Sequence, residues 1–205
     1  LRFRWVTCDE LYGRSTDFLD GVADLDRWYF AEVPHDTRVW KTHPETGVPE
    51  WPGRGRHPTK ERLLPGEPAS QRVDDIAAAL KPGDWHPYQI KEGSKGPMVA
   101  EFAFLRGVAV RDGLPGTDVW IVFRRSLGND PELKVYLSNA PPDTPVTALV
   151  RVAGLRWPVE TAIEESMDHY EVRSWLGWHH HMIECLLAHH FLVRCQKRLK
   201  RGLQH

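Results

Sequence analysis

The stretch VTCDELYGRSTDFLDGVADLDRWYFAEVP, residues 6–34, decides the fold class of this chain. Its start completes a candidate β-strand over residues 3–8, and its end, residues 27–34, is rich in the aromatic and β-branched residues that favour a second strand. Between them, residues 15–25 have helical spacing of apolar residues and begin with a Ser-Thr pair suited to an N-cap. A strand, a helix and a strand in this order predict two parallel strands of an α/β sheet.

Asp9 follows the first strand directly and is the first candidate for a chemical role. One explanation is structural, because Asp forms turns and caps helix N-termini. The other is metal binding, because acids at strand ends and on a flanking helix can hold two divalent metals for phosphoryl transfer. Glu160, in the first turn of a late predicted helix, is the second candidate. Its structural explanation is that an acid at a helix N-terminus stabilises the helix dipole. Glu164, one turn later, is an alternative to Glu160.

Composition limits the class of protein. A net charge of −1 over 205 residues gives no overall basic field. Every charged residue from Arg194 to the end is basic, however, and such a tail is either a solvated helix end or a binding site for a polyanion. Three scattered cysteines, Cys8, Cys185 and Cys195, favour a reducing cytoplasm over a disulfide framework. No apolar run reaches the roughly 18 residues of a membrane helix. Because Leu1 already lies in or near a strand, we expect the C-terminal part of a longer protein.

The middle of the chain changes character twice. Residues 41–70 are rich in Pro, Gly and Arg and predict a long loop, and residues 71–80 predict a short helix. Three strand candidates with short turns then predict an antiparallel, β-rich insertion, at residues 98–110, 118–126 and 133–139.

The end of the chain is helical in pattern. Thr144 is the expected N-cap of a helix whose first residue is Pro145, and a long amphipathic helix near the C-terminus has a potential break at Gly177. In that helix His181, Cys185 and His189 share one face, but three ligands fall short of the four of a structural zinc site. Trp40 and Trp51 suit either the core or stacking on an unpaired base.

Five segments in one order carry a family resemblance. They are VTCDELYG, VPHDTRVW, EGSKGP (92–97), WIVFRRSL (120–127) and the run from LRWPVETAIEES through DHYEVRSWLGWHHHMIECLLAHHFL. This pattern resembles the DDE transposases of bacterial insertion sequences, with their Tyr-Arg-Glu-Lys type signature. The resemblance implies an RNase H-like α/β core, a cytoplasmic bacterial protein without a membrane segment, and transposon-end DNA as partner. It also implies a homodimer as one state of the intact protein.

The resemblance assigns roles to matching positions. In the family two Asp and one Glu bind two Mg²⁺ ions, for which Mn²⁺ can substitute, and the ions activate water or a DNA 3′-hydroxyl. Asp9 matches the second acid and Glu160 the third. Arg156, four residues before the Glu, matches a residue that contacts a DNA phosphate; the alternative is that Arg156 forms a surface salt bridge. Further DNA-binding candidates, each with a solvated or structural alternative, are Lys95, Arg173, Lys197, Arg198 and the less favoured His181.

Some positions depart from the pattern. The first acid should lie on an upstream strand that this sequence lacks, Ala153 stands where the family has Tyr, and Met167 stands where it has Lys. We therefore expect a partial RNase H-like core without its first strands, inactive alone. The expected division is a core part at 1–37, a β-rich insertion at 38–142, and core helices with a basic tail at 143–205. The alternative is a non-catalytic remnant that binds DNA or protein.

Overall fold

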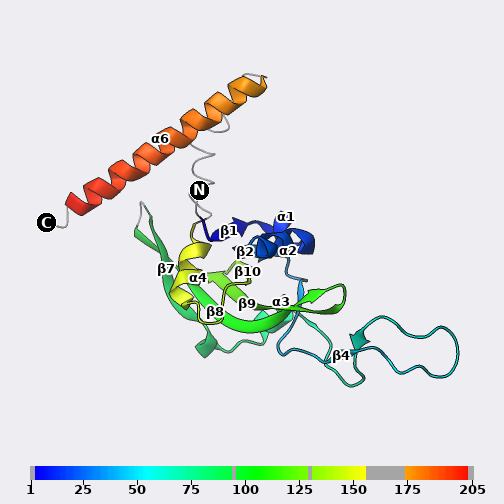
Figure 1. Ribbon diagram of the computed structural model, residues 1–205. Helices are drawn as coiled ribbons and strands as arrows, with labels where there is room; N and C mark the ends of the chain where they lie inside the picture. The colour runs from blue at the N-terminus through cyan, green and yellow to red at the C-terminus, as the bar shows by residue number, and fades with distance from the viewer. Residues whose placement is uncertain (1–2, 94–95, 129–130, 156–173, 203–205) are drawn as a thin grey trace. The chain divides into compact units, whose positions relative to one another are not determined.

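The computed structural model describes residues 3–93, 96–128, 131–155 and 174–202 (Figure 1). The chain divides into two compact units, Leu1–Gly154 and Leu155–His205. The first unit is a mixed α/β structure, and the described part of the second is a single helix.

The first unit begins with the strand, helix and strand that the sequence predicts. The elements are β1 (Trp5–Cys8), α1 (Glu10–Gly13), α2 (Thr16–Asp24) and β2 (Trp28–Val33). Ser15 caps α2, because its Oγ accepts a hydrogen bond from the Phe18 amide at 3.3 Å. β1 and β2 are parallel, with Trp5 opposite Trp28 and Cys8 opposite Ala31. The predicted parallel pair is therefore confirmed.

An eight-stranded mixed sheet forms the centre of this unit. Its order is β1-β2-β10-β9-β8-β3-β6. Strand β7 lies outside this order and pairs with a different part of β8 from the part that pairs with β3. The added strands are β3 (Arg38–Trp40), β6 (Gln71–Arg72), β7 (His86–Gly93), β8 (Gly96–Arg111), β9 (Leu114–Ser126) and β10 (Leu133–Ser138). Every pairing other than β1 with β2 is antiparallel. Among the described residues β1 is an edge strand.

The strands within residues 98–139 are antiparallel, as expected, but they do not lie outside the sheet that contains β1 and β2. β10 pairs directly with β2, with Val135 opposite Val33 and Leu137 opposite Ala31. The sheet is continuous because these strands, like β2, carry apolar residues that face both sides. The division of the chain at residues 38 and 142 stays a prediction.

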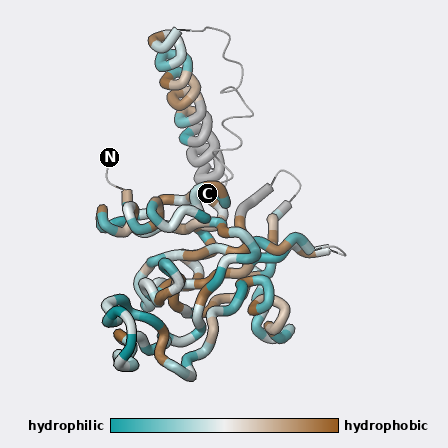
Figure 2. Tube along the Cα trace, turned by 90° about the vertical axis from the view of Figure 1, so that its right-hand side faces the viewer, coloured by the Kyte–Doolittle hydropathy of each residue, from teal (hydrophilic) through white to brown (hydrophobic). Residues whose placement is uncertain are grey.

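Both faces of the sheet are buried, and alternation along the strands assigns residues to each. On one face Tyr29, Ala31, Ile121 and Phe123 join a core with α2 and α3 (Val73–Ala78). On the other face Phe30, Val122 and Tyr136 join a core with α4 (Val146–Ala153). In Figure 2 hydrophobic and hydrophilic positions are interspersed along the trace of this unit. The sheet is thus the middle layer of three.

Two helix starts differ from expectation. The N-cap of α4 is Pro145 rather than Thr144. Thr144 is buried and its amide donates to the Pro141 carbonyl at 3.0 Å, so it belongs to the preceding turn. In the segment 71–80, where one short helix was expected, the first two residues form strand β6 and the helix α3 begins only at Val73.

The loop over 41–70 contains a small two-stranded sheet. β4 (Thr46–Gly47) pairs antiparallel with β5 (Arg62–Leu63), and residues 48–61 extend beyond this pair as an arm (Figure 1). A 3₁₀ turn, η1 (Pro82–Asp84), later connects the region after α3 to β7.

In the second unit, α6 (Trp175–Gly202) contains Gly177 without a break. The Gly177 amide lies in the first turn, where it lacks an intrahelical acceptor, and it donates to Ser174 Oγ at 3.1 Å instead. Cys185 Sγ lies 3.5 Å from His181 Nε2, while the side chain of His189 lies outside the described residues. Over the described ranges, no helix is long and apolar enough to cross a membrane.

Candidate acid site at the carboxyl end of β1

Asp9 connects β1 to α1 and serves as the N-cap of α1. Its backbone is extended, with φ −82° and ψ −179°, and its Oδ1 accepts a hydrogen bond from the Tyr12 amide at 3.3 Å. The structural explanation for this acid is therefore correct. The same geometry leaves Oδ2 without a hydrogen-bond or ion-pair partner among the described residues, so the half-buried carboxylate can still act as a hard oxygen ligand.

Gly13 fixes the position of α1, and hence of Asp9, against β2. The Gly13 amide donates to the Asp9 carbonyl at 2.8 Å and closes the single turn of α1. Gly13 is buried, and a Cβ added there would lie 1.8 Å from the Glu32 carbonyl oxygen. The backbone of α1 therefore touches the backbone of β2, which only glycine permits at this separation.

The charges near Asp9 are largely paired with one another. Arg14 Nη2 lies 3.3 Å from Glu10 Oε1, one helical turn apart, and Lys134 Nζ lies 3.2 Å from Glu32 Oε1. Neither basic residue forms an ion pair with Asp9. Among the residues that the structure describes, the Asp9 carboxylate therefore has no cationic side chain as a partner.

A hollow of about 490 Å³ lies beside α1 and the carboxyl end of β2, with both basic and acidic residues in its wall. Its charged and hydroxyl side chains are Arg14, Thr16, Asp36, Thr37, Arg38 and Arg111. Arg111 is held by Asp20, since its Nε and Nη2 donate to both carboxylate oxygens at 2.8–2.9 Å. Burial raises the pKa of the neighbouring Tyr29, and the Arg111 guanidinium opposes that rise.

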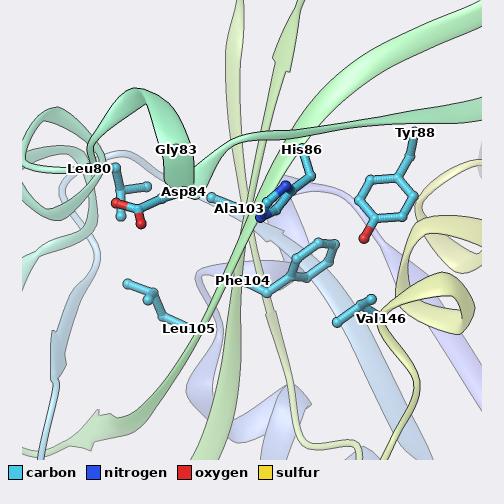
Figure 3. Close-up of a pocket in the computed structure, with 9 residues that line it drawn as sticks. All are labelled: Leu80, Gly83, Asp84, His86, Tyr88, Ala103, Phe104, Leu105 and Val146. Atoms are coloured by element: carbon cyan, nitrogen blue, oxygen red, sulfur yellow. The ribbon is translucent and has the colours of Figure 1, made fainter.

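A second hollow, of about 440 Å³, opens between η1, β7, β8 and the start of α4 (Figure 3). Asp84 is the acid in its wall, and the Asp84 carboxylate already accepts a hydrogen bond from the Lys81 amide at 2.8 Å. His86, Tyr88 and Phe104 line the rest of the wall together with aliphatic residues. This hollow therefore offers no group of acids for a metal.

The other site residues expected from the sequence have different outcomes. Lys95, Arg156, Glu160, Arg173 and the alternative Glu164 lie outside the described residues. Lys197 and Arg198 lie on α6, but the described part of the structure does not include their side chains. In the described ranges no three His, Cys, Asp or Glu side chains are close enough to hold a metal. The meeting of Asp9 and Glu160 stays a prediction.

The two tryptophans considered for base stacking differ in their exposure to solvent. Trp40 is 3% exposed and its Nε1 donates to the Pro68 carbonyl at 2.9 Å, so it belongs to the core. Trp51 is 44% exposed on the arm and stacks on His57, with ring centroids 4.5 Å apart. Arg54 and Arg56 lie between these two rings in the sequence and were not among the predicted DNA contacts, although the basic run GRGRHPTKER was a visible signal.

Asp9 is thus an acid at the carboxyl end of one of two parallel strands in a three-layered α/β unit, where its carboxylate can supply one oxygen ligand to a divalent metal. Residues 1–97 match the model of a protein family described as DDE superfamily endonuclease. This match contains Asp9 and Lys95 and supports the DDE endonuclease and transposase superfamily, whose members act on DNA and typically use divalent metals. No curated protein matches the chain.

Proposed function

We propose that this chain is the C-terminal part of a DDE transposase of the bacterial insertion-sequence type. In this proposal the intact protein cleaves and rejoins DNA at transposon ends, and Asp9 and Glu160 are two of its metal-binding acids. The observation that supports it best is the position of Asp9. It follows β1, at the edge of the sheet where both parallel strands end, within the segment that matches DDE superfamily endonucleases.

The chemistry of Asp9 fits a divalent cation. Mg²⁺ and Mn²⁺ prefer carboxylate oxygens, and Asp9 offers a half-buried carboxylate with one oxygen engaged in the helix cap and the other unpaired among the described residues. The cap also fixes the carboxylate on a short turn held against β2. A bound metal would supply an activated water or 3′-hydroxyl and neutralise charge on the phosphate.

The remaining roles follow from the resemblance. Glu160 is the third acid, and Arg156 contacts a phosphate through its forked guanidinium. The proposed fold is RNase H-like, and in that fold the edge of β1, which has no second partner strand among the described residues, accepts a further strand that carries the first acid. Lys95, Arg173, Lys197 and Arg198 are proposed contacts to the DNA backbone.

Metal-directed cleavage of the protein itself tests whether Asp9 and Glu160 share a site. Fe²⁺ replaces Mg²⁺, and ascorbate with hydrogen peroxide then generates hydroxyl radicals that cut the backbone near the bound ion. We expect cuts near residue 9 and near residue 160, both suppressed by excess Mg²⁺. Asp9→Asn keeps the helix cap, since Asn caps as well as Asp, and it should remove both cuts. Glu160→Gln should do the same.

The matched control is Asp36→Asn, which changes an exposed acid just beyond β2. This control should leave both cuts in place. Cuts near residue 9 that persist in Glu160→Gln, with none near residue 160, would contradict a shared site and reject Glu160 as its partner.

The second candidate function is a non-catalytic module that binds DNA or protein. It is favoured by Ala153 and Met167, which stand where the family pattern has Tyr and Lys. Reading the gene upstream of Leu1 separates the two candidates. An in-frame strand with an Asp supports the transposase, and an unrelated sequence supports the module.

A further inference from the structure

The arm at residues 48–61 carries three cations, Arg54, Arg56 and Lys60, and two acids, Glu50 and Glu61, which flank them in the sequence. Between Trp51 and Lys60 the sequence contains Arg54, Arg56 and Lys60 and no acid. All three cations are exposed, and none forms an ion pair with any residue that the structure describes. Arg72, Arg111 and Arg125 in the same unit are, by comparison, three cations that do have a carboxylate partner. The arm cations are therefore available to an external anion.

The arm has a defined shape. β4 and β5 hold its base, where the Leu64 amide also donates to the Glu45 carbonyl at 3.1 Å. Nearer the tip, the Trp51 and His57 rings stack with an angle of 18° between their planes, and Trp51 Nε1 donates to the Gly55 carbonyl at 3.2 Å. These contacts close a small loop around residues 52–56. A closed loop loses less entropy on binding than an open one.

The tip of this loop is narrow. Gly53 and Gly55 both have φ of +78°, and a Cβ added at either would meet nothing within 4 Å. These glycines are therefore required by the backbone conformation and not by packing inside the protein. They leave Arg54 and Arg56 as the only side chains between Gly53 and His57 that extend beyond the backbone.

A thin loop with two arginines suits one kind of nucleic-acid surface. The major groove of B-DNA is about 12 Å wide and accepts a helix or a two-stranded ribbon, whereas the minor groove is only about 6 Å wide. The minor groove narrows further in A·T tracts, where its more negative potential attracts arginine. The extra amino group of guanine obstructs the floor of the groove in G·C pairs.

We propose that the tip of the arm inserts Arg54 and Arg56 into the minor groove of A·T-rich duplex DNA. Beside the tip, a hollow of about 550 Å³ has Arg56, His57, Lys60 and Arg62 in its wall, together with Glu50. Lys60 and Arg62 on this surface contact the phosphates that flank the groove. This binding needs neither metal nor the acids of the proposed active site, so it goes beyond the proposed function.

Fluorescence anisotropy with the whole chain and 20-base-pair duplexes tests the proposal, in EDTA so that no metal site contributes. We expect the chain to bind an A·T-rich duplex more tightly than a G·C-rich one. Arg54→Ala/Arg56→Ala should weaken binding to the A·T-rich duplex by at least about tenfold and should remove most of the preference. Netropsin, which occupies the A·T minor groove, should displace the unaltered chain.

The matched control is Lys81→Ala/Arg151→Ala, which removes two exposed cations outside the arm. This control should weaken binding to the two DNA duplexes slightly and by the same factor. Circular dichroism confirms that each variant is folded. Three results would overturn the proposal: equal losses on the two DNA duplexes in the arm variant, no displacement by netropsin, or tighter binding to duplex RNA, whose minor groove is wide and shallow. Because the assay excludes metal, its failure is distinct from failure of the proposed acid site.

Discussion

Replacing Gly13 with alanine tests how α1 positions Asp9. The added Cβ would lie 1.8 Å from the Glu32 carbonyl oxygen and 2.9 Å from the Glu32 carbonyl carbon. Ordinary van der Waals contact begins near 3.4 Å, so α1 and β2 must separate by about 1.6 Å. Both obstructing atoms belong to the backbone of a strand paired on both sides, so neither can rotate away.

The expected cost follows from this geometry. Overpacking a well-packed site costs about 1–3 kcal/mol, occasionally more, and a backbone clash belongs at the upper end. Alanine recovers up to about 1 kcal/mol through its higher helix propensity. We therefore expect the free energy of unfolding to fall by about 2–3 kcal/mol and the melting temperature to fall by about 5–10 °C.

Gly21→Ala is the matched control, because Gly21 is exposed on α2 and an added Cβ there meets nothing within 4 Å. This change should raise the free energy of unfolding by about 0.5–1 kcal/mol. Urea unfolding followed by tryptophan fluorescence measures both variants. Equal stability of Gly13→Ala and the unaltered chain would refute the close packing of α1 on β2, and with it the rigid placement of Asp9.

Two further predictions concern stability. Asp9→Ala should lower the free energy of unfolding by about 0.5–2 kcal/mol through loss of the cap, whereas Asp9→Asn should leave it nearly unchanged; equal urea midpoints for the two variants would contradict the cap. Burial raises the pKa of Tyr29 and of Tyr136, so their contribution to stability is complete below about pH 10 and is lost as pH rises through the raised folded-state values. Tyr136→Phe should flatten this alkaline decline in thermal melts, and an unchanged slope would show that Tyr136 does not cause it.

Local patterns in the sequence were enough to predict the parallel pair of strands. Residues 3–8 and 27–34 are apolar and β-branched, the segment between them has helical spacing, and Ser15 is a strong N-cap. Each of these signals acts over a few residues, and the chirality of the crossover then leaves parallel pairing as the natural arrangement. The structure confirms the pair as β1 and β2.

Other features depended on residues far apart in the chain. Nothing local indicates that β10 pairs with β2, because an alternating strand can bury its faces against many partners. Strands β3 and β7 were missed because their own local signals are weak. β3 is only three residues long, and β7 begins with His86-Pro87, which rarely starts a strand.

The candidate site divides in the same way. Sequence alone identified Asp9 as an acid at a strand end, and it also supplied the two roles, cap and ligand, that one carboxylate can fill. Tertiary structure decided that Trp40 is core and that Trp51 is exposed, since burial depends on neighbours such as Pro68 that lie well along the chain. It also showed that the cations of the arm lack carboxylate partners among the described residues, whereas Arg111 finds Asp20 across 91 positions of sequence. Ion pairing between distant residues is a property of the fold, and composition cannot reveal it.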